Sequence, residues 1–323
     1  MKINFNKLMF YSTMTWGVIF SISSNSWMMI WIGLEISMMS IMPLMCNKNL
    51  LSSESSMKYF IVQSISSSLM MWGVLLMIIN SKMTFQAILS MSLLMKMGVS
   101  PFHNWMMEII EGLDYTMVFT LLTLMKLAPL NFMSYLSMKL SLFSFMSMVI
   151  GSMMGITQNS IRKILGYSSI FNMGFMLTSI NKNSIWMSFM LTYSTTLLMT
   201  ILLMTKYKMF YINQVMSNDS LTSKLNIWII MLSLGGLPPM IGFMGKFMII
   251  QTMMENMEML ISLTMILTSI FTMYFYMRIS FVMIMFSSLL MKWKTIKLNK
   301  MSNLAMLINL LILPLTLTLK SFL

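Results

Sequence analysis

Long apolar runs separated by short polar breaks dominate the chain. A helix needs about 20 mostly apolar residues to cross the ~30 Å hydrocarbon layer of a membrane. Such runs lie near residues 4–22, 26–46, 57–80, 84–105, 114–136, 141–159, 164–180, 185–205, 225–250, 258–286 and 302–320. They are continuous and longer than the alternating stretches of a membrane β-barrel. We therefore predict an all-α polytopic membrane protein with about eleven transmembrane helices.

The composition excludes most soluble classes. Of the 323 residues 58% are hydrophobic and 9% are charged, and the mean hydropathy is +0.80, whereas about a quarter of the residues of a soluble domain are charged. The net charge of +13 reflects a shortage of acids, with 8 Asp and Glu against 21 Lys and Arg. We therefore expect neither a soluble enzyme nor a disordered chain, and no nucleic acid partner.

Few residues could hold a metal or a redox group. The chain has one cysteine, Cys46, and one histidine, His103, and an iron–sulfur cluster normally needs four thiolates. We expect no cofactor, no metal site and no internal disulfide in this chain.

Methionine is unusually frequent, at 51 residues. No packing requirement explains this number, although Met fits irregular apolar interiors. An AT-rich genome that reads ATA as Met is the simpler interpretation, and it points to mitochondria. The N-terminus enters its first apolar run without a recognisable cleavage site.

The basic residues are distributed unevenly between the breaks. If alternate breaks lie on opposite sides of the membrane, thirteen Lys and Arg fall on one side and four on the other. Basic residues are enriched on the inner side of membrane proteins. We therefore predict an N-terminus and a basic stretch at 292–300 on the inside, and a C-terminus on the outside.

Four ionisable residues lie inside apolar runs: Glu35, Lys96, Lys126 and Lys246. Such residues are costly in a membrane and mark functional sites by default. Burial raises the pKa of a carboxyl group and lowers that of an amine, so both can exchange protons near neutral pH. The alternative is structural, with lysines that extend to the headgroups and a fixed interhelical bond at Glu35. His103 is a further relay candidate, or a residue that merely caps the end of its helix.

Two of the runs are interrupted by a Gly-x-x-Pro pattern, at Gly98–Pro101 and Gly236–Pro239. Proline breaks a helix, and broken helices at matching positions of two halves are typical of transporters with inverted repeats. The interrupted runs are the fourth and the ninth. We therefore predict one transmembrane domain, 1–323, with inverted five-helix repeats at about 1–136 and 141–286 and a final helix at about 302–320.

Several motifs, in order along the chain, resemble those of one family. They are Gly33-Leu34-Glu35-Ile36, Lys58-Tyr59-Phe60, Lys96 with Pro101-Phe102-His103, Lys126-Leu127-Ala128-Pro129, Arg162-Lys163-Ile164-Leu165-Gly166-Tyr167-Ser168-Ser169 and Leu234-Gly235-Gly236-Leu237-Pro238-Pro239. The chain resembles the antiporter-like membrane-arm subunits of respiratory complex I, the NADH:ubiquinone oxidoreductase.

The resemblance implies a proton-translocating subunit in the mitochondrial inner membrane, with the N-terminus in the matrix and the C-terminus in the intermembrane space. It implies proton transfer through Glu35, Lys96, His103, Lys126, Lys246 and water. The enzyme would be an NADH:ubiquinone reductase, with FMN, iron–sulfur clusters and ubiquinone held in partner subunits. Other membrane-arm subunits, including antiporter-like ones, and lipids such as cardiolipin would be its partners.

Two residues depart from the family pattern. Asn172 stands where many relatives have a histidine, so it could orient water but could not carry a proton itself. Gly245 replaces a proline that is common before the last lysine, which suggests a looser break. A subunit of a cation/proton antiporter, which shares these motifs, remains the alternative function. A purely structural anchor would not need four buried charges.

Overall fold

The computed structural model describes residues 5–46, 49–79, 83–136, 138, 140–217 and 221–287. In these ranges every regular element is a helix, and an isolated bridge between Ser160 and Tyr211 is the extended pairing. The all-α prediction is therefore confirmed. The predicted helix at 302–320 and the basic stretch at 292–300 lie outside the described residues, so the total of eleven stays a prediction.

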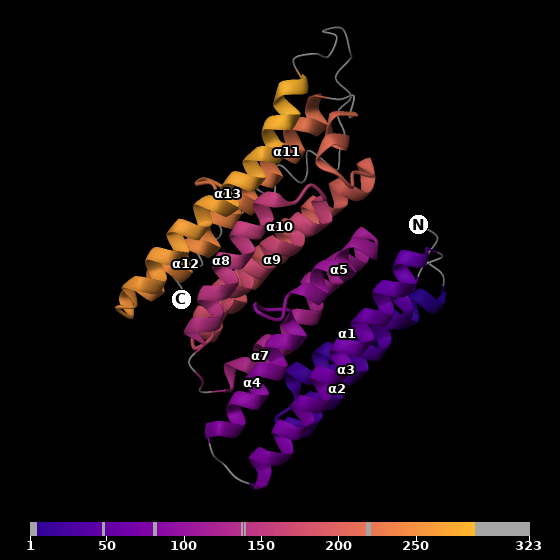
Figure 1. Ribbon diagram of the computed structural model, residues 1–323, viewed down its shortest axis with the longest axis vertical. Helices are drawn as coiled ribbons and strands as arrows, with labels where there is room; N and C mark the ends of the chain where they lie inside the picture. The colour runs from indigo at the N-terminus through magenta and orange to yellow at the C-terminus, as the bar shows by residue number, and fades with distance from the viewer. Residues whose placement is uncertain are drawn as a thin grey trace. The chain divides into compact units, whose positions relative to one another are not determined.

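Two compact units divide the chain, Met1–Met146 and Ser147–Leu323. The first contains α1 (Phe5–Ser23), α2 (Trp27–Met45), α3 (Leu50–Ile79), α4 (Met83–Met97), α5 (Asn104–Gly112), α6 (Tyr115–Leu122) and α7 (Leu124–Ser134). All of these but α6 are labelled in Figure 1. The helix α8 (Ser141–Thr157) contains the boundary. The second unit continues with α9 (Ile161–Thr178), α10 (Asn183–Tyr207), the short 3-10 helix η1 (Ile212–Ser217), α11 (Leu221–Gly235), α12 (Ile241–Glu255) and α13 (Met259–Ser287). The proposed inverted repeats remain a prediction.

Five described segments are long and apolar enough to cross a membrane: α2, α3, α6 with α7, α10 and α13. Shorter apolar stretches occur in α4, α8 and α11. Most helix bounds lie close to the predicted runs, but α3 begins at Leu50, well before the predicted residue 57.

The predicted interruption of the fourth run is present between α4 and α5, and that of the ninth lies between α11 and α12. The fifth run is also divided, at Thr123, which we did not predict. The Thr123 hydroxyl donates a hydrogen bond to the carbonyl of Phe119, 2.7 Å away, and such bonds from threonine often bend a helix. The break falls three residues before Lys126 and thus shapes the backbone around it.

The helices α4 and α11 end in the same way. The Gly98 amide donates to the Met95 carbonyl and the Val99 amide to that of Leu94. This is the Schellman arrangement, which needs a residue in the left-handed region, and Gly98 has a φ of 67°.

At the end of α11 the amides of Gly236 and Leu237 donate to the carbonyls of Ser233 and Leu232. Gly236 has a φ of 88°. At both breaks carbonyl groups at the helix end therefore accept hydrogen bonds from backbone amides of the chain itself. This suits a membrane interior, where water is scarce.

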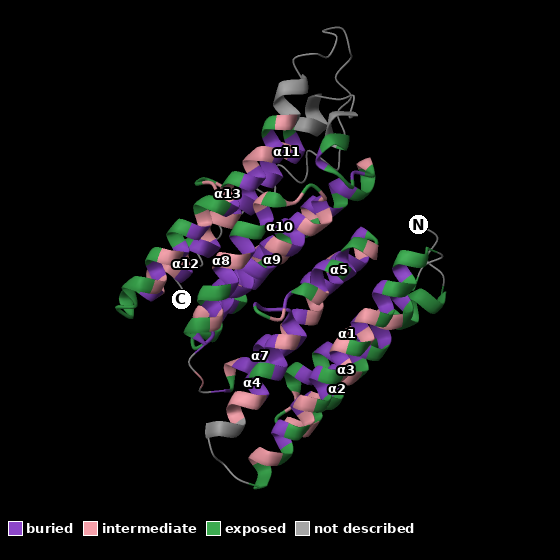
Figure 2. Ribbon diagram, viewed as in Figure 1, coloured by how far each residue is buried: buried purple, intermediate pink, exposed green. Residues whose placement is uncertain are grey.

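Side-chain burial in α3 reverses the pattern of a soluble protein. In α3 the buried face carries serines together with Tyr59 and Gln63, while Ile61, Ile65 and Trp72 are exposed. Figure 2 shows exposed and buried residues on opposite sides of single helices. Apolar side chains that face outward and small polar ones that face inward fit a lipid surrounding, where helices associate through small residues.

Glycines allow a close contact between two helices of the first unit. A Cβ atom on Gly17 would lie 2.8 Å from the backbone nitrogen of Ser37, and one on Gly33 would lie 2.9 Å from the carbonyl oxygen of Gly17. The backbones of α1 and α2 therefore touch directly. This contact, at Gly33, holds α2 against α1 at a point two residues before Glu35.

Candidate functional site

Lys96 and Glu35 form a buried ion pair in the first unit. The Lys96 Nζ atom lies 3.6 Å from Oε1 of Glu35, and the side chains are 4% and 19% exposed. Lys96 occupies the last turn of α4, where the negative end of the helix dipole favours a cation. The sequence placed both residues inside apolar runs, and the fold brings them together from α4 and α2.

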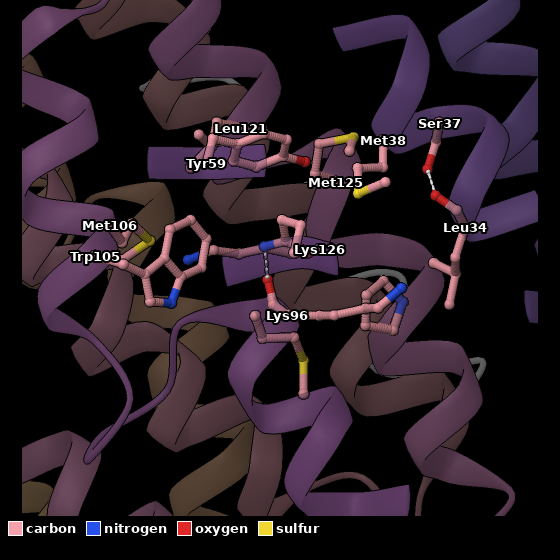
Figure 3. A pocket seen from close by; sticks show the side chains of 13 residues that line it. Leu34, Ser37, Met38, Tyr59, Lys96, Trp105, Met106, Leu121, Met125 and Lys126 are labelled. Carbon is pink, nitrogen blue, oxygen red and sulfur yellow. Dashed lines mark hydrogen bonds between the residues drawn. The ribbon is translucent and has the colours of Figure 1, made fainter. Parts of the chain in front are cut away.

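A pocket connects Lys96 of this pair to a second lysine, Lys126. Lys96 and Lys126 both line it, and Figure 3 shows their side chains with those of Tyr59 and Trp105. Lys126 is buried near the start of α7. Two lysines therefore share one enclosed space, where like charges repel more strongly than in water.

Two polar side chains of the pocket were not identified from the sequence. Gln63 donates a hydrogen bond from Nε2 to the Lys96 carbonyl, 3.3 Å away, an oxygen near the end of α4 that has no helical partner. Trp105 lies with its ring centroid 6.1 Å from that of Tyr59. The sequence did contain a signal for Gln63. Ser55, Tyr59 and Gln63 recur every four residues and therefore lie on one face of α3.

His103 lies in the connection between α4 and α5 and is 9% exposed. Its Nδ1 atom lies 3.2 Å from the carbonyl oxygen of Pro101. It stands at the start of α5 without a capping bond from its side chain, and it is not among the residues that line the pocket. Its role as a relay therefore remains a prediction.

Lys246 belongs to the second unit and has different partners. Its Nζ donates to the carbonyl oxygens of Gly235 at 2.8 Å and Leu234 at 3.4 Å. These oxygens lie at the end of α11. The ammonium also lies 5.1 Å from the centroid of the Phe171 ring, a favourable cation–π distance. Lys246 thus uses backbone dipoles and a ring where Lys96 uses a carboxylate.

The two departures from the family pattern both lie near Lys246. Asn172 and Lys246 line one small cavity. Gly245 lies within α12, beyond the break, and a Cβ there would lie 2.7 Å from the Phe189 ring. The glycine therefore lets α12 approach α10, and it does not loosen the interruption itself.

No group of three or more His, Cys, Asp or Glu in the described ranges could hold a metal ion. The arrangement of the first unit can instead hold and release protons, because Lys96 pairs with the Glu35 carboxylate and shares a pocket with Lys126.

Known proteins resemble this chain in sequence and in fold. The model of the family described as NADH:quinone oxidoreductase/Mrp antiporter, TM matches residues 24–272. The chain is 37% identical over 316 residues to NADH-ubiquinone oxidoreductase chain 2 of Anopheles gambiae, covering 93% of each chain. It is 34% identical over 334 residues to the protein of that name from Bos taurus, covering 94% of this chain and 95% of the bovine one.

Respiratory complex I from Thermus thermophilus contains a similar chain, with a TM-score of 0.80 and 18% identity, over 96% of this chain and 80% of that one. The Mrp complex from Dietzia contains another, with a TM-score of 0.77 and 15% identity, over 84% and 59%. These structures show the fold alone. From the matched family and the sequence identity, the chain belongs to the NADH:quinone oxidoreductase/Mrp antiporter membrane family, within its NADH-ubiquinone oxidoreductase chain 2 group.

Proposed function

We propose that the chain is a proton-translocating membrane subunit of a mitochondrial NADH:ubiquinone oxidoreductase. NADH oxidation and ubiquinone reduction occur in other subunits, and this chain contributes proton-transfer groups. The observation that supports the proposal most is the buried pair of Lys96 and Glu35, at 3.6 Å, beside a pocket shared with Lys126.

The pair controls how firmly Lys96 keeps its proton. A carboxylate at this distance favours the ammonium form of Lys96. When Glu35 is neutralised, or is drawn toward a neighbouring subunit, the ammonium loses that support. Positive charge on Lys126 in the same pocket adds to the repulsion. Lys96 then releases its proton into the pocket, whereas an arginine could not.

The remaining groups of the proton path are assigned because they too are ionisable and buried. Lys126 receives the proton within the first unit, Lys246 acts in the second, and His103 serves the connection between α4 and α5. The chain lies in the inner membrane, with its N-terminus in the matrix and its C-terminus in the intermembrane space. Its partners are other membrane-arm subunits, including antiporter-like ones, and lipids such as cardiolipin.

A subunit of a cation/proton antiporter is the second candidate, favoured by the likeness to the Mrp complex from Dietzia. The two candidates differ in their assembly. The oxidoreductase subunit is expected to purify within a large complex that contains flavin and iron–sulfur proteins, and the antiporter subunit is expected without them.

Proton pumping per NADH in inner-membrane vesicles tests the proposal. We expect Glu35→Gln and Lys96→Arg enzymes to assemble and to pump fewer protons per NADH than the parent. Assembly is checked separately by native electrophoresis. If both variants assemble and pump at the parental ratio, the pair is structural and the proposed mechanism is wrong.

A further inference from the structure

A small cavity lies beside Lys246 in the second unit. Asn172 of α9, Tyr193 and Thr196 of α10, Ser233 of α11 and Lys246 of α12 are among its lining residues. Four helices thus bring polar side chains to one buried space. The proton path proposed above uses only Lys246 of this set.

Two polar atoms of the cavity stand out. Asn172 and Tyr193 are 5% and 4% exposed. In the part of the chain that the structure describes, neither Oδ1 of Asn172 nor the Tyr193 hydroxyl has a hydrogen-bond partner. The phenol lies near the Ser169 hydroxyl and the Asn172 amide, outside hydrogen-bonding geometry with either. Buried polar groups rarely go unsatisfied, so these two atoms point to a small polar ligand between them.

Other hydroxyl groups of the lining are already engaged. Thr196 Oγ1 donates to the Tyr193 carbonyl at 2.9 Å, and Ser233 Oγ donates to the Ile230 carbonyl at 2.7 Å. Their donors therefore stay within their own helices. Among the described residues that line the cavity, Asn172 and Tyr193 are the two with a buried polar atom that has no hydrogen-bond partner.

Lys246 supplies the complementary donor. An ammonium group has three N–H donors, and in the described residues two of them have acceptors, the carbonyls of Leu234 and Gly235. The side chain also lies over the ring of Phe171, the residue before Asn172. Lys246 lines the same cavity as Asn172, and its third N–H has no acceptor among the hydrogen bonds of the described residues.

We propose that Asn172 and Tyr193 hold a water molecule against Lys246. The water oxygen accepts hydrogen bonds from Lys246 Nζ and from the Tyr193 hydroxyl, and one water hydrogen is donated to Asn172 Oδ1. Three hydrogen bonds are typical of a buried water. The inference rests on the proposed function and extends it to two positioning residues.

The water is the first acceptor of the proton of Lys246. An N–H bond of the ammonium breaks and an O–H bond forms, which leaves a neutral amine and a hydronium ion. The Asn172 carbonyl oxygen stabilises that hydronium ion. Because the amide does not itself exchange the proton, Asn172 orients the water without storing charge, and Tyr193 fixes the water at hydrogen-bonding distance.

The experiment uses the assembled complex in inner-membrane vesicles. Tyr193→Phe removes one hydroxyl, Asn172→Leu removes the acceptor, and Tyr274→Phe is the matched control because Tyr274 is exposed on α13. We expect coupled NADH oxidation to fall about fivefold in the first two variants, as for the loss of one hydrogen bond, and to be unchanged in the control. Asn172→His in the Tyr193→Phe background should recover activity, because an imidazole can accept the proton itself.

Three outcomes decide the matter. Parental pumping in Tyr193→Phe and Asn172→Leu, with loss in Lys246→Met, overturns the water site and leaves the proposed function standing. Parental pumping in Lys246→Met overturns both for the second unit. If the variants fail to assemble, a high-resolution map of the unmodified complex decides: density within hydrogen-bonding distance of all three groups supports the site, and a dry cavity refutes it.

Discussion

Lys246 closes the end of α11 by donating a hydrogen bond from Nζ to the carbonyl of Gly235, 2.8 Å away. The two residues belong to helices on opposite sides of the same break. A side chain from the helix after the interruption therefore satisfies the backbone of the helix before it. The interruption and the buried charge depend on each other.

Lys246→Met should lower both stability and pumping. It removes the donor from the carbonyls of Leu234 and Gly235 and leaves them buried, at a cost of about 1–3 kcal/mol. The thermal midpoint of the assembled complex measures the first effect, and pumping per NADH the second. Lys246→Arg keeps a hydrogen-bond donor, so we expect this variant to be much more stable than Lys246→Met. We do not expect it to recover pumping. Equal stability of the two variants would contradict the capping role.

Gly98→Ala should destabilise the first unit more than Gly98→Asn. Gly98 has a φ of 67°, and alanine in this region costs roughly 1–2 kcal/mol, while asparagine adopts it more readily. Both variants add a Cβ near the Met106 sulfur, at 3.2 Å, so their difference isolates the backbone term. Assembly yield at raised temperature gives the order. Alanine performing as well as asparagine would show that the backbone tolerates the change.

Neutralising the partner of Lys96 should rescue a charge deletion. Lys96→Met leaves the carboxylate of Glu35 buried beside an apolar side chain, and an unpaired buried charge is strongly destabilising. We expect Glu35→Gln to raise the stability of the Lys96→Met enzyme without restoring pumping. Thermal unfolding of the two complexes measures this. Additive losses in the double variant would mean that the residues do not interact.

The C-terminus should be accessible from the intermembrane space and the break at 292–300 from the matrix. Thirteen basic residues on one side against four on the other support this orientation. Labels placed at the two sites and tested in mitoplasts, before and after the membrane is opened, distinguish the sides. A C-terminus protected until the membrane is opened would reverse the topology.

The isolated chain should show no flavin or iron absorption and should not oxidise NADH. Its single cysteine and single histidine cannot supply the ligands of a cluster. Spectra of the detergent-purified chain test this directly. A stoichiometric prosthetic group would refute it.

The features that could be predicted from the sequence include the residues whose burial in a membrane is energetically unfavourable. A charge in an apolar run is expensive wherever it lies, so Glu35, Lys96, Lys126 and Lys246 were recognisable. The breaks at Gly98 and Gly236 were recognisable as well, because glycine and proline act locally.

The contacts made by uncharged side chains were not predicted from the sequence. Gln63 carries no charge, and its contact with the Lys96 carbonyl depends on how α3 packs against α4. Tyr193 looks like any apolar helical residue until α9 and α12 bring Asn172 and Lys246 beside it. The division at Thr123 was missed because threonine is tolerated in helices, and its effect depends on a bond to Phe119.

The left-handed backbone at Gly98 and Gly236 limits how this gene can drift. With 51 methionines in 323 residues, nucleotide bias has been free to exchange one apolar side chain for another across most of the chain. At these two positions no such exchange is neutral, since any Cβ atom would strain a backbone of φ 67° or 88°. Mutational pressure on the genome can therefore alter the lipid-facing surface, while the two places where the helices break keep their glycines.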